Sequence, residues 1–529
     1  MPARPRSPGS VVDEVPSGVR AIAGVPTSVT AFVGRARRGM AERPAAVTGF
    51  SDFARGFGGL WHESTLGFAV RDFFANGGSS AVVVRLFGGD DTARASITWD
   101  AVTLRAVSPG AWANELRIRV DHDTRDPDPA LGEVPNTLFN LSVLDGTTGA
   151  VEEHRDVTIG IADHPRHLRT VLENESDVVR LDVPTIGNTD DRPAEHSHVV
   201  PADAAVWGQD STSTGVAPAE SADDGAPLTE RDFIGPGKEG ASQGLYALGA
   251  TDLFNLLVIP PYLDSGDVDA TVVTAAHAYC TRRRAMLIVD APAGWDAADQ
   301  VARADIPATV GTIGRNAALY FPRLRQPNPL HGNRVETFAA AGAVAGVFAR
   351  TDATRGIWKA PAGLDATLLG VAELSVSLSA AENGLLNPLG VNCLRMMPAA
   401  GPVVWGSRTG EGADGVASEW KYVPVRRTAL FIEESLHRGL QWAVVEPNNE
   451  RLWAQIRQIV GAFMHTLFSR GAFQGRTPRE AYLVKCDSET TTQADIDRGI
   501  VTIVVGFAPL KPAEFVVITI QQLAGQAAP

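Results

Sequence analysis

Cysteine is scarce in this chain of 529 residues, and long apolar runs are absent from it. The three cysteines, Cys280, Cys393 and Cys486, are odd in number and widely spaced, which argues against a disulfide framework and a cysteine-based zinc site. We therefore expect a reducing cytoplasm. The longest nearly uncharged small-apolar run, 338–349, is too short to span a bilayer, so no membrane insertion is expected. The start, MPARPRSPGS, lacks the apolar region of a signal peptide.

Basic residues are few in one part of the chain. Residues 91–235 hold 11 arginines against 27 acidic residues, whereas the formal net charge of the whole chain is −14. The remainder is therefore nearly neutral, and residues 420–480 are net basic. We interpret the acidic segment as a well-solvated surface domain.

The apolar pattern predicts an α/β protein with several domains. Buried strands are expected at 81–86, 255–260, 285–290 and 317–321, with a helix at about 268–283. Strands that alternate with helices indicate a βαβ layer with a mixed or parallel sheet. We expect this α/β domain to be discontinuous and to cover residues 21–90 and 235–395.

Residues 91–234 have a different pattern, which predicts an inserted, mostly-β domain. Short strands are expected at 102–104, 116–120, 138–143 and 178–181. Residues 185–230 are polar, aperiodic and rich in Pro, Gly and Ser, so we expect a long loop.

Residues 396–508 are expected to form a C-terminal α+β core domain. Apolar residues recur there at three- and four-residue spacing: Leu452, Trp453, Ile456, Ile459, Val460, Phe463, Met464 and Leu467. This spacing predicts an amphipathic helix that Asn448-Asn449 can cap and Gly471 ends.

The last apolar stretch of the chain, Phe515 to Ile520, has strong β-propensity and no evident hairpin partner. The strand expected before it covers residues 500–507. The linker between them contains Pro509 and Pro512 and no tight-turn signal, so it is expected to be extended. The residues themselves leave the pairing partner of this strand open.

Two short motifs suggest enzyme chemistry, and neither has the context that the chemistry needs. Gly240-Ala241-Ser242-Gln243-Gly244 matches a nucleophile elbow, but no buried strand precedes it, so we interpret it as a loop. Gly237-Lys238 resembles the end of a phosphate-binding loop, but Glu239 replaces the required Ser or Thr. We expect no catalytic residue and no enzyme activity.

Candidate ligand-binding residues are equally isolated. His62-Glu63 lacks a second histidine at metalloprotease spacing, and His196 and His198 are interpreted as a solvated pair in the polar linker. Asp290 ends a strand at a position where α/β proteins bind ligands, but no second carboxylate or glycine-rich loop supports it. We expect no metal and no cofactor.

A set of ordered motifs gives a more specific indication. They are Pro8-Gly9, Val12 to Gly18, Ala31 to Gly34, Gly356 to Gly363 (GIWKAPAG), Leu386-Asn387 with Val391-Asn392, Val404 to Thr409 (VWGSRT), Val425 to Arg427, Glu446 to Asn448, Val484 to Asp487, and Ala508 to Phe515. In this order they resemble the sheath protein of contractile phage tails and of phage tail-like contractile injection systems. The resemblance covers roughly residues 8–90 and 231–526. The acidic segment carries none of these motifs, so the resemblance implies an outer domain, and we predict that excising residues 91–230 leaves assembly intact.

The resemblance implies that the two chain ends are donor arms, residues 1–20 and 509–529, which add strands to the C-terminal domain sheets of neighbouring subunits. The implied inter-subunit strand contacts are Val11, Val12, Val15, Phe515, Val516, Val517, Ile518 and Ile520. The implied arm hinges are Pro16, Gly18, Pro509 and Pro512. This would give the orphan terminal strand a partner.

The resemblance also implies the partners. They are other copies of the chain in a helical polymer of stacked, hexameric rings, an inner tube protein, and baseplate and terminal cap proteins, with no direct nucleic-acid contact. The net-basic C-terminal domain is expected to face the tube, with Arg451, Arg457 and Arg470 as possible contacts. Assembly is expected in the bacterial cytoplasm, as part of a phage tail or a phage tail-like injection particle.

Two other classes of function stay open. One is a non-contractile structural filament that also uses donor strands, and the other is an α/β hydrolase. A hollow sheath of two lengths would indicate contraction, and a filament of one fixed length would not.

Overall fold

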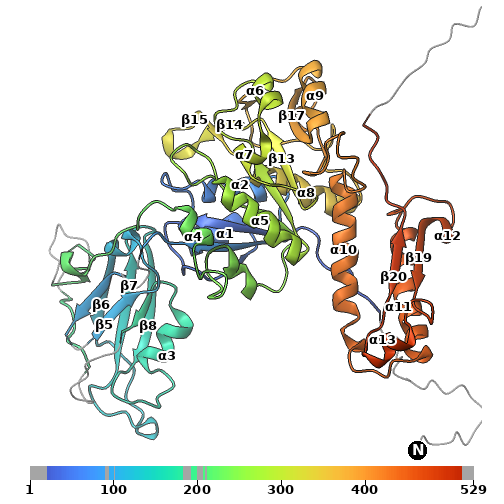
Figure 1. The fold of residues 1–529 in the computed structure, drawn as a ribbon. Helices are drawn as coiled ribbons and strands as arrows, with labels where there is room; N and C mark the ends of the chain where they lie inside the picture. The colour runs from blue at the N-terminus through green and yellow to red at the C-terminus, as the bar shows by residue number, and fades with distance from the viewer. Residues whose placement is uncertain are drawn as a thin grey trace, which may run out of the picture. The chain divides into compact units, whose positions relative to one another are not determined.

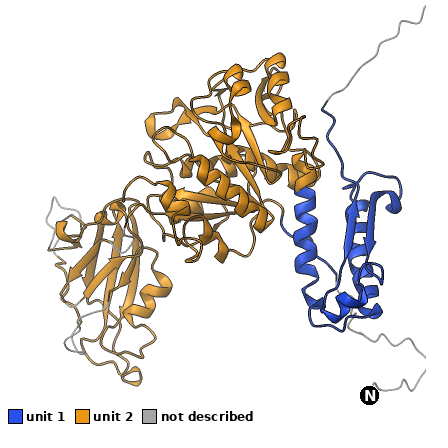
Figure 2. Cartoon of the chain, viewed as in Figure 1, with its two compact units in different colours: residues 1–26, 427–529 blue, residues 27–426 orange. Residues whose placement is uncertain are grey.

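The computed structural model describes residues 21–89, 94–100, 102–182, 192–198, 206–208 and 211–514 (Figure 1). The chain divides into two compact units, one of residues 27–426 and one of residues 1–26 and 427–529 (Figure 2). The predicted arm residues Val11, Val12, Val15, Pro16 and Gly18, and the strand 515–520, lie outside the described residues. Across the described ranges, no helix has the length and apolar character needed to cross a membrane.

The larger unit is built on an eight-stranded sheet, which confirms the predicted α/β class. The strands lie in the order β18 (Gly401–Val404), β17 (Val391–Met397), β13 (Ala317–Phe321), β12 (Met286–Asp290), β11 (Leu256–Val258), β1 (Thr30–Arg35), β3 (Ala81–Leu86) and β2 (Ala45–Val47). The six inner strands are parallel, and the two edge strands are antiparallel. Phe32 of β1 pairs with Val83 of β3 on one side and with Val258 of β11 on the other. All four strands expected for this domain are present.

Helices cover both faces of this sheet, because its inner strands are apolar on both sides. Ala31 and Val33 face the core that contains α5 (Ala270–Arg283) and α6 (Ala298–Arg303). Phe32 faces the core that contains α1 (Phe50–Phe57), α2 (Leu66–Ala75) and α8 (Ala341–Arg355). The further elements of this domain are α4 (Glu230–Ile234), α7 (Ile306–Val310), α9 (Ala380–Leu386), and a small sheet of β14 (Leu324–Asn328), β15 (Arg334–Phe338) and β16 (Glu373–Leu374).

The small-residue run 338–349 forms most of α8, where it packs against α2. A Cβ atom on Gly342 or Gly346 would lie 2.3 Å from the carbonyl oxygen of Ala69 or 2.4 Å from that of Phe73. Only glycine allows the two helix backbones to approach this closely, which explains why the run contains small residues without being a membrane segment.

The acidic segment forms two antiparallel sheets around a core of its own. One sheet contains β4 (Ser96–Trp99), β5 (Val102–Ala106) and β9 (Val179–Leu181), and the other contains β6 (Leu116–Asp121), β7 (Phe139–Asp145), β8 (Ala150–Val157) and β10 (Thr214–Gly215). The helix α3 (Leu168–Glu175) packs on this core through Leu168, Val171 and Leu172. All four strands expected here are present. Gly88 pairs with Ala226, so the segment leaves and rejoins the α/β domain between these two residues.

The predicted domain boundary at residue 396 is misplaced. It falls inside β17, which pairs with β13 and then turns back to pair with β18, so both strands extend the large sheet. The division between the two compact units comes after Arg426, within the helix α10 (Val423–Gly439).

The second unit contains most of α10, the helix α11 (Glu450–Ser469), α12 (Pro478–Ala481), α13 (Gln493–Asp497), and the strands β19 (Tyr482–Lys485) and β20 (Val504–Phe507). The expected amphipathic helix is α11. Asn449 caps it by accepting a hydrogen bond from the Leu452 amide at 3.2 Å, and Gly471 follows its end with φ of 77°. Phe463 of α11 packs against Phe431 of α10, with the ring centroids 6.1 Å apart.

Candidate assembly interface

The sheet of the second unit has two strands among the described residues. β19 and β20 are antiparallel, with Tyr482 opposite Phe507 and Lys485 opposite Val504. Each strand therefore has one edge along which the described part of the chain places no further strand. An isolated pair of strands is marginally stable in water, and such an edge is a template for another strand.

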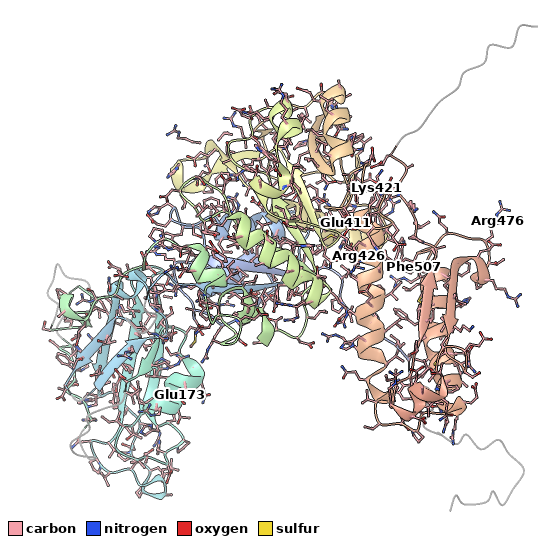
Figure 3. All side chains as sticks on the ribbon, in the orientation of Figure 1. Glu173, Glu411, Lys421, Arg426, Arg476 and Phe507 are labelled. Carbon is pink, nitrogen blue, oxygen red and sulfur yellow. The ribbon has the colours of Figure 1, made fainter. Side chains whose placement is uncertain are left out.

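The two faces of this sheet differ. On one face, Tyr482 and Phe507 contact aromatic residues at and just after the end of α11. Phe507, which is labelled in Figure 3, lies 5.6 Å from Phe473, and Tyr482 lies 6.5 Å from Phe468. On the other face, Leu483 is 56% exposed and Val504 is 43% exposed. Two exposed apolar side chains on one face, and two edges that the described residues leave uncovered, favour completion of this minimal sheet by another chain.

The predicted strand 500–507 is shorter than expected and begins at Val504. Side chains take up the backbone groups before it: Asn448 donates to the Ile500 carbonyl at 3.0 Å, and the Thr502 amide donates to Thr491 Oγ1 at 3.1 Å. A ladder cannot form where its donors and acceptors are already used.

The two described hinge residues have different surroundings. Pro509 is part of the folded unit, because it forms a bridge with Phe473, and Ala508 beside it both donates to Ala481 and accepts from Gln474. Pro512 lies in residues 510–514, to which no helix or strand is assigned. A hinge at the C-terminal arm is therefore better placed at Pro512 than at Pro509.

The three basic residues proposed for tube contact are all associated with α11, in different ways. Arg451 is exposed. Arg457 donates to the Cys486 carbonyl and to Glu450, with 2.6 Å between Nη2 and Oε1, so its charge supports the connection between α11 and β19. Arg470 caps the end of the helix with its backbone amide and is exposed.

The enzyme-like motifs lie in the surroundings that the sequence predicted. Ser242 is exposed, lies in a turn after α4 and has φ of 54°, with no strand before it in the described residues 211–241 other than the two-residue β10. Lys238 forms an ion pair with Glu42 at 2.7 Å. His62 and Glu63 are exposed and 3.3 Å apart.

Asp290 has a structural role. Its Oδ1 accepts hydrogen bonds from the amides of Ala340 and Ala341, at 2.6 and 2.8 Å, and so caps α8. Burial raises the pKa of this carboxyl against the opposing effects of Arg323 and these amides. A cavity of about 120 Å³ lies beside it and contains Arg323 and Asp267, which form an ion pair at 2.9 Å.

The interpretation of His196 as solvated is wrong. Its ring is 1% exposed, stacks on Trp99 at 4.0 Å, accepts from the Val120 amide at 3.0 Å and contacts Thr214 Oγ1 at 2.9 Å. Burial, with the nearby charge of Arg119, lowers the pKa of His196 to about 4. His198 is exposed and contacts Glu195 at 3.0 Å. Across the described residues, no group of three or more His, Cys, Asp or Glu could hold a metal ion.

Sequence reasoning missed α10 and the pairing of β19 with β20. The signal for α10 was present, because Val425, Ala429, Leu430 and Ile432 are buried at helical spacing. The pairing carries no such signal, because residues 486–503 separate the two strands.

Two family models match the chain. The phage tail sheath protein central domain matches residues 235–410, and the phage tail sheath C-terminal domain matches residues 416–522. Together they cover more than half of the chain.

The tail sheath protein of Vibrio phage KVP40 is 25% identical over 177 residues, 33% of this chain and 25% of that protein. The tail sheath protein of Enterobacteria phage T4 is 26% identical over 159 residues, 30% of this chain and 23% of that protein. The matches thus span about a quarter of the length of these relatives.

Solved sheath structures share the fold over nearly the whole chain. The contracted PVC sheath complex of an extracellular contractile injection system has a TM-score of 0.58 at 19% identity and covers 99% of both chains. The contracted helical sheath of the anti-feeding prophage has a TM-score of 0.54 at 21% identity, over 98% of this chain and 100% of that one. The sheath tail protein of Listeria innocua has a TM-score of 0.59 at 14% identity, over 93% and 96%.

Proposed function

The chain belongs to the phage tail sheath family, and on that premise we propose that it polymerises into the sheath of a contractile injection machine. Subunits assemble around an inner tube as stacked rings in an extended, metastable state. Contraction then drives the tube through a target envelope. The free energy is stored at assembly, so the chain acts as a structural protein with no catalytic step of its own.

The two-stranded sheet of β19 and β20 carries this proposal. Its two uncovered edges and its exposed Leu483 and Val504 suit strands donated by other subunits. The apolar segments for donation are Val11, Val12 and Val15 at one end of the chain, and Phe515, Val516, Val517, Ile518 and Ile520 at the other. Pro16, Gly18 and Pro512 are the hinges that let arms stay paired while subunits rotate.

The remaining partners follow from the same role. We place Arg451 and Arg470 toward the inner tube, and leave Arg457 as a support between α11 and β19 because of its hydrogen bonds there. Baseplate and cap proteins close the two ends of the polymer. The acidic inserted domain faces outward, where its charge stays solvated. Assembly takes place in the bacterial cytoplasm, and the product is a phage tail or a phage tail-like injection particle.

The experiment that tests this role is co-expression with the inner tube and baseplate proteins from the same gene cluster, followed by negative-stain microscopy. We expect hollow sheaths in two lengths, long before and short after triggering with acid or urea. Filaments of a single length would instead favour a non-contractile structural polymer that uses the same donated strands. Monomers under all conditions would contradict both.

A further inference from the structure

A groove with a volume of about 650 Å³ lies along α11 in the second unit. Residues from three places line it: α11 itself, the connection between α10 and α11, and the first described residues, Ala21 and Ile22. At the connection, Val444 is 68% exposed and Val445 is fully exposed with φ of 68°, an unusual conformation for a β-branched residue. Val444 and Val445 are thus exposed apolar residues beside an open groove, and the backbone of Val445 is strained. These features indicate a surface that another segment covers.

The chain segment next to this groove is held in place by contacts with α10. Val25 donates its amide to Ser435 Oγ of α10 at 3.2 Å. A Cβ atom on Gly439 would lie 2.7 Å from Ile22, and a Cβ atom on Gly24 would lie 2.8 Å from Phe431. Residues 22–25 are thus packed tightly on α10, and Ala21, the first described residue, lines the groove.

The lining suits a peptide better than an anion or a nucleotide. The apolar lining residues include Trp442, Leu452, Ile459 and Phe463, and the polar ones include Gln455 and Gln458. Side-chain amides can both donate to and accept from an extended backbone. Among the described lining residues only Glu446 and Arg451 are ionisable, which gives no excess of either charge.

The segment before Ala21 fits this groove in length and pattern. Its last six residues, VPSGVR at 15–20, place Val15 and Val19 on one side of an extended chain, with Ser17 between them. Six or seven extended residues span about 20 Å. The groove follows α11 from Leu452 to Thr466, a rise of about 21 Å.

We infer that the groove is the docking site for residues 15–20 of the same chain. A segment attached at the groove wall has an effective concentration on the order of millimolar, so in a free subunit it competes well against the arms of other subunits. On the proposed function, which this consequence requires, a free subunit holds its own N-terminal arm until a neighbour's sheet takes it. Docking then delays polymerisation away from the growing end.

Disulfide trapping in the full chain tests the docking. The native Cys280, Cys393 and Cys486 are buried, so mild oxidation reaches introduced cysteines first. In the double variant Val15→Cys/Gln458→Cys, we expect an intrachain disulfide in most molecules at 1 µM or below, with a yield independent of protein concentration. The matched control is Val15→Cys/Gln493→Cys, whose second site is exposed in the same unit but outside the groove. Equal yields in the two variants would overturn the proposal.

Two lysine substitutions test whether trapping depends on the groove. Ala462 lines the groove, whereas Ala454 is exposed on the same helix and does not. Adding Ala462→Lys should lower the trapping yield at least fivefold, and adding Ala454→Lys should leave it unchanged. Trapping that occurs only when Val15→Cys and Gln458→Cys are on different chains would show that a second copy is the occupant, and would overturn docking within one chain.

The assembly assay separates this inference from the proposed function. If docking delays polymerisation, Ala462→Lys should polymerise at a lower subunit concentration than the unmodified chain. Intrachain trapping with no polymer in any variant would sustain docking and contradict the sheath role. Polymers that form equally in both lysine variants, with no trapping above the control, would sustain the sheath role and contradict docking.

Discussion

Arg38 and Asp145 form a buried ion pair, with 2.6 Å between Nη1 and Oδ2, that joins the α/β domain to the inserted domain. Arg38 follows β1, and Asp145 is the last residue of β7. They are 8% and 3% exposed. Burial acts to raise the pKa of Asp145, but hydrogen bonds from Thr147, Thr148 and Arg38 outweigh it and hold this pKa below its ordinary value. The acidic segment is therefore anchored through a charge pair that needs both partners.

Replacing Arg38 by Met should destabilise the larger unit by about 3–5 kcal/mol, because it leaves the Asp145 carboxylate buried without its cation. Urea unfolding followed by circular dichroism measures this. Adding Asp145→Leu to the same chain should recover part of the loss, since it removes the unpaired charge. The matched control is Arg55→Met, whose pair with Asp52 is exposed and should change stability by less than about 0.5 kcal/mol. An equal effect of Arg38→Met and Arg55→Met would show that the buried pair contributes nothing.

That excising the inserted domain leaves assembly intact stays a prediction, but the bounds 91–230 are unsuitable for testing it. That cut removes Leu228, which is 3% exposed in the core of the α/β domain. It also removes Asp145 and the Pro109 carbonyl, which accepts from Nη2 of the 1% exposed Arg85 at 2.9 Å. A cut from residue 90 to 223 keeps Leu228 and the pairing of Gly88 with Ala226.

We predict that the chain without residues 90–223 melts at a lower temperature than the full chain, and that changing Arg38 to Met destabilises this shortened chain by less than about 0.5 kcal/mol. The penalty expected in the full chain disappears because the cut removes Asp145, so that no carboxylate is left buried without its cation. Differential scanning calorimetry of the two shortened chains measures the difference. A shortened chain that Arg38→Met destabilises as strongly as the full chain would contradict the assignment of the anchor to the Arg38–Asp145 pair.

The strands of the α/β domain could be predicted because their residues are apolar on both faces. Ala317–Phe321 has the same bounds in sequence and structure, and α11 was recognisable from its apolar stripe and Asn449 cap. Residues whose role depends on distant contacts could not be predicted. Arg38 and His196 are polar in sequence and buried in the fold, because Asp145 and Trp99 reach them from remote positions. The partner of β20 is likewise set by packing on α11, for which the local sequence carries no signal.

The inserted domain should lose stability in mild acid through His196. Its pKa in the fold is about 4, below the ordinary value of 6.5, so the unfolded chain binds the proton more readily. The contribution is complete above pH 6.5 and is lost as the pH falls toward 4, by up to about 3 kcal/mol. Hydrogen exchange of residues 116–145, corrected for its intrinsic pH dependence, measures this loss of stability between pH 7 and 4.5.

The variant His196→Asn should flatten this dependence of stability on pH, and His198→Asn, at an exposed site, should not. Identical profiles for all three chains would assign the acid sensitivity elsewhere.

Leu483→Lys should separate folding from assembly. Leu483 is 56% exposed and points away from the aromatic face of the sheet, so the substitution should change monomer stability by less than about 0.5 kcal/mol. In a polymer the same face is expected to be covered, where an unpaired charge is costly. Sheath length by negative-stain microscopy and monomer unfolding by urea measure the two effects. Gln493→Lys, exposed on α13, is the control that should affect neither.

The C-terminal arm gives the sharpest test of strand donation. Removing residues 513–529 should leave unfolding of the monomer within about 1 kcal/mol of the full chain, as expected of an arm that pairs with a neighbouring subunit. The cut starts at 513 because Ala508 and Pro509 hydrogen-bond and pair with Ala481, Gln474 and Phe473, and a cut at 509 would remove part of that folded unit. The same truncation should abolish long sheaths, because every subunit loses its donated strand and leaves an edge of the neighbouring β19–β20 sheet unfilled. Sedimentation velocity gives the oligomeric state, and negative-stain microscopy gives the polymer length. Full-length sheaths from the truncated chain would mean that residues 515–520 are not donated, and a monomer that unfolds would mean that they pair within their own subunit.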